Sequence, residues 1–221
     1  MSRIQFQNNK YYHVYNRGIE KRDIFMDYQD FVRFIRSMRE FNVVQPIGSL
    51  YEKDYKKTTE TKSPIGDLVS SSAVSSPLVN LISYSLIPNH YHFMIEQLED
   101  KGISKFMHKL NLGYSMYFNK RYNRSGSLFE GPFKIKEVNS YSHFLKLLVY
   151  VNCNYEVHKL GKSKDWIWSS YLDSIGARNG SLCNLDVVKN EFRDLNEFKN
   201  FCNQVLPDII KIKELKKYLL E

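Results

Sequence analysis

The sequence predicts an α+β protein with a ferredoxin-like split β-α-β fold and an antiparallel sheet. Hydrophobic periodicity gives the order strand, helix, strand, strand, helix, strand, with a further helix directly after the last strand. The dipeptide Pro88-Asn89 lies between two apolar runs and predicts a turn that pairs two strands. We therefore expect one domain over residues 1–175, followed by a helical extension over residues 176–221.

The first half of the chain contains one strand and one helix. We expect the strand at residues 11–17 and the helix at residues 28–41, where apolar residues recur at three- and four-residue steps: Phe31, Phe34, Ile35 and Met38. Residues 52–77 are rich in Lys, Thr and Ser and contain Pro64, Gly66 and Pro77. Such a composition predicts a flexible insertion.

The second half contains the remaining elements. Strands are expected at residues 78–86, from residue 90 onward and at 133–138, with a helix at 102–121 before the last strand. A further helix is expected over residues 139–155, capped by Asn139 or Ser140, with Gly161 beyond its end. We expect Trp166 and Trp168 to clamp the C-terminal region to the domain. The C-terminal region itself is expected to form two short helices.

Two histidines flank one tyrosine where the Pro88-Asn89 turn opens into a strand. Side chains alternate along a strand, so His90 and His92 point to one face and Tyr91 to the other. Neighbouring imidazoles make a metal site plausible, although two such residues can also be a hydrogen-bonded pair on a sheet surface. A third ligand and a nucleophile elsewhere would decide between these interpretations.

A candidate third ligand and a candidate nucleophile both lie in the helix expected at 139–155. Its core stripe contains Phe144, Leu148, Val151 and Tyr155, whereas Tyr150 and Asn154, four residues apart, project together from another face. Taken alone, each could be a solvated surface residue. Together with the histidine pair they suggest a nucleophile and a metal ligand.

Several motifs in one order resemble the single-tyrosine HUH (His-hydrophobe-His) transposases, and most closely the branch associated with repetitive extragenic palindromes. They cover most of residues 11–175: YHVYNRG at 12–18, DIF at 23–25, PNHYH at 88–92, YFNKRY at 117–122, GSLFEG at 126–131 and WSSY at 168–171.

The resemblance implies an HUH endonuclease fold and a role for each site residue. His90 and His92 would hold Mg²⁺ or Mn²⁺, Asn154 would complete the metal site, and Tyr150 would be the nucleophile. Cleavage of single-stranded DNA, folded into a hairpin, would leave a 5′-phosphotyrosine and a free 3′-hydroxyl that can rejoin strands. The chain departs from many relatives because Tyr155, not proline, follows Asn154.

Several other residues are expected to contact DNA. The net charge of +8 and the pI of about 9.2 suit a polyanionic partner. Basic residues and aromatic residues alternate over 101–124, although most of the aromatic side chains there have helical core spacing. Our candidates for DNA binding are Arg17, Lys105, Lys109, Arg121, Tyr122, Arg124, Lys134 and Lys146.

Tyr114 and Tyr117 are rival nucleophiles, because they lie in a basic helix soon after the histidine pair.

Three widely spaced cysteines suggest free thiols in a reducing compartment. The sequence shows no apolar N-terminal segment and no apolar run of membrane-spanning length, which predicts a cytoplasmic or nucleoid-associated protein without a membrane partner. The sequence leaves open a homodimer that exchanges the tyrosine helix.

Three other functions remain open. A DNA- or RNA-binding protein retained by its host could keep this fold without transposition. A rolling-circle replication initiator or relaxase would use the same two histidines and tyrosine, but such proteins commonly carry a helicase, and this sequence has no GxxxxGK[ST] phosphate loop. A plain metal hydrolase is less suited to a tyrosine nucleophile.

Overall fold

The structure is a computed structural model that describes residues 6–45, 48, 50 and 76–218. It contains a four-stranded sheet of order β2-β3-β1-β4, in which all neighbouring strands are antiparallel. Its strands are β1 (Tyr11–Arg17), β2 (Val79–Ile87), β3 (His90–Gln97) and β4 (Lys134–Glu137). This order confirms the predicted ferredoxin-like fold class. The insertion predicted at 52–77 lies outside the described residues except for 76–77.

The register of β3 separates the histidine pair from the hydrophobic core. On one face of the sheet, Tyr91 and Phe93 are fully buried in a large apolar cluster. On the other face, His90 lies opposite Arg17 and His92 lies opposite Tyr15 of β1. The alternation predicted from the sequence is therefore present, and it directs both imidazoles away from the aromatic core.

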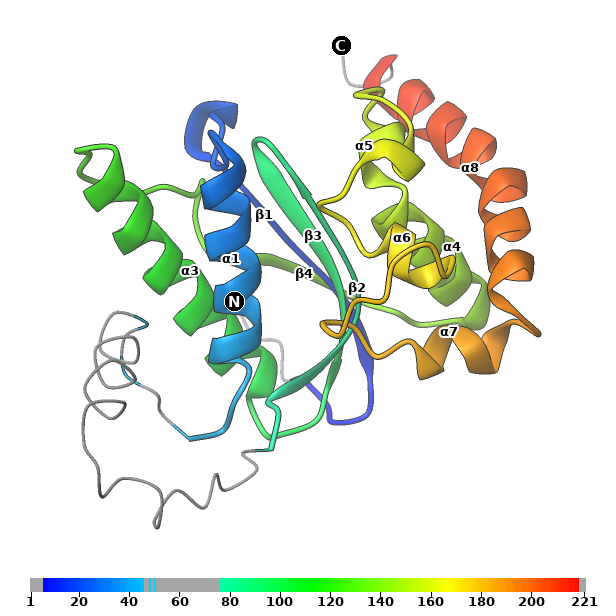
Figure 1. Cartoon of the computed structure of the whole chain (residues 1–221), viewed down its shortest axis with the longest axis horizontal. Coiled ribbons are helices and arrows are strands. Elements are labelled where there is room, and N and C mark those ends of the chain that lie inside the picture. Colours follow the sequence, from blue (N-terminus) through cyan, green and yellow to red (C-terminus); the bar gives the residue numbers. More distant parts are fainter. Residues whose placement is uncertain (1–5, 46–47, 49, 51–75, 219–221) are drawn as a thin grey trace, which may run out of the picture.

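Two helices, α1 (Tyr28–Phe41) and α3 (Gly102–Arg121), cover the first face of the sheet (Figure 1). The short 3-10 helix η1 (Ile19–Lys21) precedes α1. Asp27 caps α1 by accepting hydrogen bonds from the backbone N–H groups of Gln29 and Asp30. Phe34 and Met38 are buried as predicted, whereas Ile35 is only half-buried.

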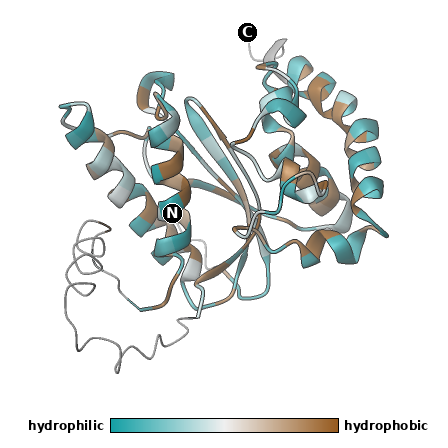
Figure 2. Ribbon diagram, viewed as in Figure 1, coloured by the Kyte–Doolittle hydropathy of each residue, from teal (hydrophilic) through white to brown (hydrophobic). Residues whose placement is uncertain are grey.

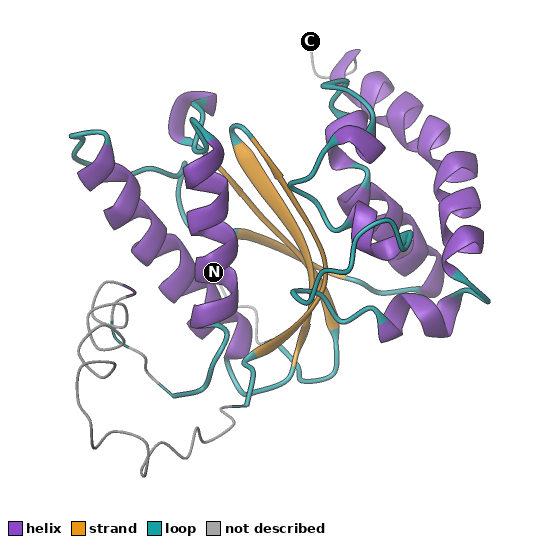
Figure 3. Ribbon diagram, in the orientation of Figure 1, coloured by secondary structure: helices purple, strands orange, loops and turns teal. Residues whose placement is uncertain are grey.

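The other face is covered by α4 (Tyr141–Asn152), and α8 (Leu195–Tyr218) packs on the outer side of α4, so that the sheet lies between two groups of helices (Figure 3). Hydrophobic segments occur in the strands and in both layers (Figure 2). Ser140 caps α4 by accepting a hydrogen bond from the backbone N–H of His143. The helix ends at Asn152, earlier than predicted, and the chain continues as the single turn α5 (Asn154–Val157).

This early end takes Tyr155 out of the predicted core stripe. Its ring stacks on Trp166, with 4.1 Å between ring centroids, and the Trp166 indole donates a hydrogen bond to the Leu86 carbonyl. Trp168 stacks on Phe31 of α1, with 4.7 Å between centroids. The two tryptophans thus attach the segment after α5 to the sheet and to α1, as expected.

The C-terminal region differs from the prediction of two short helices. After η3 (Ser163–Asp165), α6 (Tyr171–Ser174) and α7 (Asp186–Glu191), it ends in the long helix α8. Phe198, Cys202 and Leu206 are spaced by four residues and bury one face of α8 in the same cluster as α4. Within the described part of the chain, no helix combines the length and apolarity needed to cross a membrane.

Asp30 is fully buried and organises one end of the first helical layer. Its carboxylate accepts hydrogen bonds from the hydroxyls of Tyr117 and Tyr122, the guanidinium of Arg121 and the backbone N–H of Met26. A buried carboxylate requires such donors to offset its loss of hydration. Arg121 and Tyr122, expected from the sequence to bind DNA, are therefore engaged within the protein.

Replacement of Asp30 should strongly destabilise the fold. In Asp30→Ala the hydroxyls of Tyr117 and Tyr122 and the backbone N–H of Met26 lose their buried acceptor, and we expect the free energy of unfolding to fall by about 3–5 kcal/mol. Urea denaturation measures this change. Asp208→Ala, which removes an exposed carboxylate from α8, is the control and should change stability by no more than about 0.5 kcal/mol. Equal effects of the two substitutions would contradict the role of Asp30.

Candidate active site

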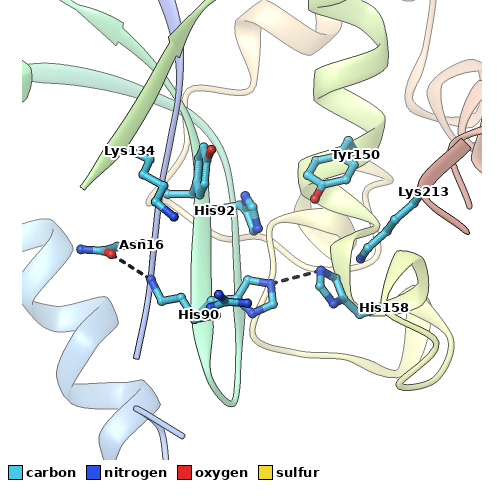
Figure 4. A pocket seen from close by; sticks show the side chains of 9 residues that line it. Asn16, His90, His92, Lys134, Tyr150, His158 and Lys213 are labelled. Carbon is cyan, nitrogen blue, oxygen red and sulfur yellow. Dashed lines mark hydrogen bonds between the residues drawn. The ribbon is translucent and has the colours of Figure 1, made fainter. Parts of the chain in front are cut away.

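A cavity of about 230 Å³ opens on the face of the sheet that carries the histidine pair. Side chains from β1, β3 and β4, from α4 and α8, and from the end of α5 line it (Figure 4). The lining residues are Tyr15, Asn16, Arg17, His90, His92, Lys134, Tyr150, His158 and Lys213. The predicted histidines and the predicted tyrosine therefore meet in one cavity of a single chain.

Three histidines converge at this cavity. Potential ligand nitrogens of His90, His92 and His158 all lie within 4.8 Å of one another. The Nε2 atoms of His90 and His158 are 3.2 Å apart. Nitrogens that share one transition-metal cation are separated by about 3 Å, because each bond to the metal is about 2.1 Å long. The spacing of these imidazoles thus fits a common metal ion.

Neighbouring side chains orient two of these imidazoles. The Nδ1 atom of His90 lies 2.6 Å from the Asn89 side-chain oxygen, so Nδ1 carries the proton and Nε2 keeps its lone pair. The Nδ1 atom of His92 lies 2.8 Å from Nε2 of His13. If His92 offers Nε2 to a cation, its Nδ1–H donates to His13, which is the usual outer contact of a metal-binding histidine.

Electrostatics favours the neutral form of all these histidines. Burial lowers the pKa of His90 to about 2, of His13 to about 3 and of His158 to about 4. Burial also lowers the pKa of His92 well below its usual value, and nearby His13 and His90 add to this shift. Since only the neutral imidazole can bind a metal, the cluster is in the ligand form at neutral pH.

Asn154 is fully buried beside the cluster, close enough to His90 and Tyr150 to shift the pKa of both, but neither the oxygen nor the nitrogen of its amide makes a hydrogen bond of good geometry to the described residues. An unsatisfied buried amide costs free energy, so this side chain needs a partner that the protein itself does not provide. A metal ion bound by the three imidazoles could accept the amide oxygen as a further ligand. The residues present therefore fit a divalent cation, as predicted for Asn154.

Tyr150 projects from α4 into the same cavity, and Figure 4 shows its hydroxyl pointing toward the histidines. Its ring meets that of His92 edge to face, with 5.4 Å between centroids. Burial raises the pKa of Tyr150, while the side chain of Asn154 opposes that rise. The phenol is therefore protonated at neutral pH and must lose its proton when it attacks an electrophile.

The rival tyrosines lie elsewhere. Tyr114 is fully buried in the core on the opposite face of the sheet and donates a hydrogen bond to the Ile24 carbonyl. Tyr117 donates to Asp30 in the same layer. Neither residue lines the cavity. Both tyrosines therefore have structural roles, in packing and in hydrogen bonding within the fold.

The candidate DNA-binding residues separate into two groups. Arg17 and Lys134 line the cavity, where both form ion pairs with Glu130, and Lys146 is exposed on α4 one turn before Tyr150. The others lie on α3 or just after it, in the layer that covers the opposite face of the sheet: Lys105, Lys109, Arg121, Tyr122 and Arg124. Of these candidates, only Arg17 and Lys134 line the cavity that holds the histidines.

His158 and Lys213, which α8 contributes, are absent from the site residues predicted from the sequence. A signal for His158 was present, because Tyr150, Asn154 and His158 follow one another at four-residue steps and helical residues so spaced share one face. Lys213 had no comparable signal. It is more than fifty residues from the tyrosine in sequence, and only the packing of α8 on α4 and α5 brings it to the cavity.

The chain is similar to known transposases in part of its sequence and in its fold. Residues 58–152 match the family described as "Transposase IS200 like", and the matched segment contains His90, His92 and Tyr150. No curated protein matches the sequence. One similar solved structure is described as the REP-associated tyrosine transposase bound to a REP hairpin. It has a TM-score of 0.50 and 12% identity, and the alignment covers 83% of this chain and 93% of that one.

At 12% identity, the structural similarity shows a shared fold, whereas the family match links the sequence itself to the IS200-like transposases. The family match, over less than half of the chain, agrees with the resemblance to transposases inferred from the motifs. Asn154, His158 and Lys213 lie beyond the matched segment, and their assignment here depends on their positions around the cavity.

Substitution of His158 should weaken metal binding. Loss of one imidazole ligand should reduce the affinity of the protein for Mn²⁺ at least about tenfold, since even outer contacts of metal ligands contribute that much. Isothermal titration calorimetry with Mn²⁺ measures the effect. His108→Ala, which removes an exposed histidine of α3, should leave the affinity unchanged. If His158→Ala also binds Mn²⁺ normally, His158 is not a ligand.

The metal-free protein should lose stability as the pH falls. An unfolded histidine titrates near pH 6.5, whereas burial depresses the pKa of His92 in the folded state. Protons therefore bind preferentially to the unfolded chain, and stability present above about pH 6.5 is lost on acidification, by up to about 1.4 kcal/mol per pH unit for each such group. Urea denaturation between about pH 7 and 5 should give a shallower pH dependence for His92→Asn than for His143→Asn.

Proposed function

We propose that this chain, which carries an IS200-like transposase core over residues 58–152, cuts and rejoins single-stranded DNA through a covalent bond to Tyr150. The observation that carries this proposal is the position of the Tyr150 hydroxyl, which points toward three neutral imidazoles in one cavity. A phenol beside a metal-binding cluster suits transfer of a phosphoryl group to the protein.

The reaction would be an exchange of phosphodiester bonds. The Tyr150 oxygen attacks the phosphorus, loses its proton and forms a 5′-phosphotyrosine, while the bond to the 3′ oxygen breaks and that oxygen leaves as a hydroxyl. The new bond retains the energy of a phosphodiester. A 3′-hydroxyl can therefore attack the phosphotyrosine, release Tyr150 and join two strands without a nucleotide cofactor.

The ligand set would be His90, His92, His158 and Asn154. A divalent cation held there would neutralise charge on the phosphate and favour in-line attack. We expect Mn²⁺ or Mg²⁺ as the ion. Three imidazoles favour Mn²⁺ over Mg²⁺, because magnesium prefers oxygen ligands and water.

The basic residues at the cavity provide a path for the DNA backbone. Arg17 and Lys134 share Glu130 as their counter-ion, and both remain partly exposed. An incoming phosphate can replace that carboxylate as a partner of either side chain. Lys146 extends the basic surface along α4. We assign these three residues to binding of the strand that Tyr150 cleaves.

The substrate we propose is single-stranded DNA that folds into a hairpin beside the cleavage site. The similar solved structure is described as bound to a REP hairpin, and the two chains share a fold. The three histidines and Tyr150 of one chain lie together, and we propose that the site is assembled within one chain. A homodimer stays a prediction, and the proposed chemistry is independent of it.

Covalent trapping tests this function. Labelled single-stranded oligonucleotides that tile the flanks of the gene would be incubated with the protein and Mg²⁺ or Mn²⁺, and adducts separated on denaturing gels. We expect a metal-dependent adduct with the wild type and none with Tyr150→Phe. His92→Ala should reduce its rate about a hundredfold or more, because charge stabilisation at the phosphate is lost. Tyr141→Phe, an exposed position on the same helix, should react normally.

Peptide mapping of the adduct then identifies the modified residue. An adduct on another tyrosine would contradict the assignment of Tyr150. Tight DNA binding without any adduct would favour the host-retained, non-catalytic function. Cleavage without rejoining by an added 3′-hydroxyl strand would favour a nickase of the replication-initiator type.

A further inference from the structure

The long C-terminal helix α8 reaches the cavity with one of its lysines. This helix packs on α4, which carries Tyr150, and on α5, which precedes His158. Lys213 is half-buried and lines the cavity, and Figure 4 shows its side chain extending toward His158. The ammonium group is thus placed beside the histidine cluster, although the sequence separates it from both the histidine pair and the tyrosine.

Lys213 differs from the other cations at the cavity. Arg17 and Lys134 each form an ion pair with the carboxylate of Glu130. Within the described residues, no carboxylate lies within salt-bridge distance of Lys213, and its ammonium donates one long hydrogen bond of 3.4 Å to the Val157 carbonyl. Burial also lowers the pKa of Lys213 to about 8, so at neutral pH it remains mostly charged. A half-buried ammonium with a single weak acceptor has capacity for an anionic ligand.

The end of α8 is held in place beside the cluster. Glu214 forms an ion pair with Lys159, the residue after His158, while Lys213 contacts the carbonyl of Val157, the residue before it. Adjacent residues of α8 therefore contact the residues on both sides of His158, at the Val157 carbonyl and at the Lys159 side chain. This arrangement fixes the direction of the Lys213 side chain relative to the imidazole.

We propose that Lys213 binds a non-bridging oxygen of the phosphate that Tyr150 attacks, so that the C-terminal helix completes the active site. The proposal rests on the proposed function. Lysine cannot be a metal ligand while protonated, and the cavity lining contains no acidic residue that could take its charge. A phosphodiester placed between Tyr150 and the histidines would bring its anionic oxygens to this ammonium and would supply the missing partner.

Three variants of the full chain test the proposal. Lys213→Met removes the charge and keeps most of the apolar stem, Lys213→Arg keeps the charge, and Lys211→Met removes an exposed lysine from the same helix. The rate of adduct formation is measured with the gene-flank oligonucleotides under single-turnover conditions. We expect Lys213→Met to react about a hundredfold more slowly, Lys213→Arg to retain most activity, and Lys211→Met to match the wild type. Thermal unfolding verifies that all variants fold.

Binding provides a readout that does not depend on cleavage. In a Tyr150→Phe background, the affinity for the same oligonucleotides is measured as a function of salt concentration. Loss of one phosphate contact with single-stranded DNA should lower the slope of log K against log[salt] by about 0.7 for Lys213→Met. The mapped scissile phosphate is then neutralised as a methylphosphonate. This change should weaken DNA binding by the Tyr150→Phe parent. When Lys213→Met is added to that parent, the phosphate contact is already lost, so the methylphosphonate should not weaken binding further.

The outcomes separate this proposal from the proposed function. If the wild type forms an adduct and Lys213→Met is equally fast, the role of Lys213 is overturned while the transposase chemistry stands. If Lys211→Met lowers the rate and the salt slope as much as Lys213→Met, the effect is general electrostatics and the assignment fails. If the wild type forms no adduct, the proposed chemistry fails, and an unchanged salt slope in Lys213→Met overturns the phosphate contact as well.

Discussion

The structure depends on the alternation of side chains along β3. This strand lies inside the sheet and has neighbours on both sides, so its register is fixed by β1 and β2. Tyr91 and Phe93 fill the core under α1 and α3, whereas His90 and His92 face α4. A shift by one residue would bury two imidazoles among aromatic rings and expose those rings in the cavity. Burial of the aromatic core thus also positions the metal-binding face.

Local patterns in the sequence were sufficient for most of the fold and for part of the site. The two-residue period of β3, the four-residue spacing of Tyr150 and Asn154, and the cap at Ser140 are features of neighbouring residues, and the structure contains each of them. Arg17, predicted to bind DNA, lines the cavity because it belongs to the strand that pairs with the histidines.

Features that depend on distant contacts could not be obtained in this way. The basic and aromatic residues near the end of α3 have the composition of a DNA-binding surface, but the buried carboxylate of Asp30, far away in sequence, engages Arg121 and Tyr122. Likewise, His13 acquires a role only when the pairing of β1 with β3 brings it to a ring nitrogen of His92. Side-chain chemistry predicts capacity for a contact, whereas packing determines the partner.

Charge at the cavity links metal binding to DNA binding. Its imidazoles are neutral, Arg17 and Lys134 share Glu130 as an ion-pair partner, and the carboxylates among the described residues leave Lys213 unpaired. A divalent cation alone would add positive charge beside this ammonium, and a phosphate alone would not supply a ligand to the amide oxygen of Asn154. Together, the phosphate would place a negative charge between the two cations while the divalent cation binds the amide. On the proposed function, metal and DNA should therefore bind cooperatively, each raising the affinity of the protein for the other by the same factor.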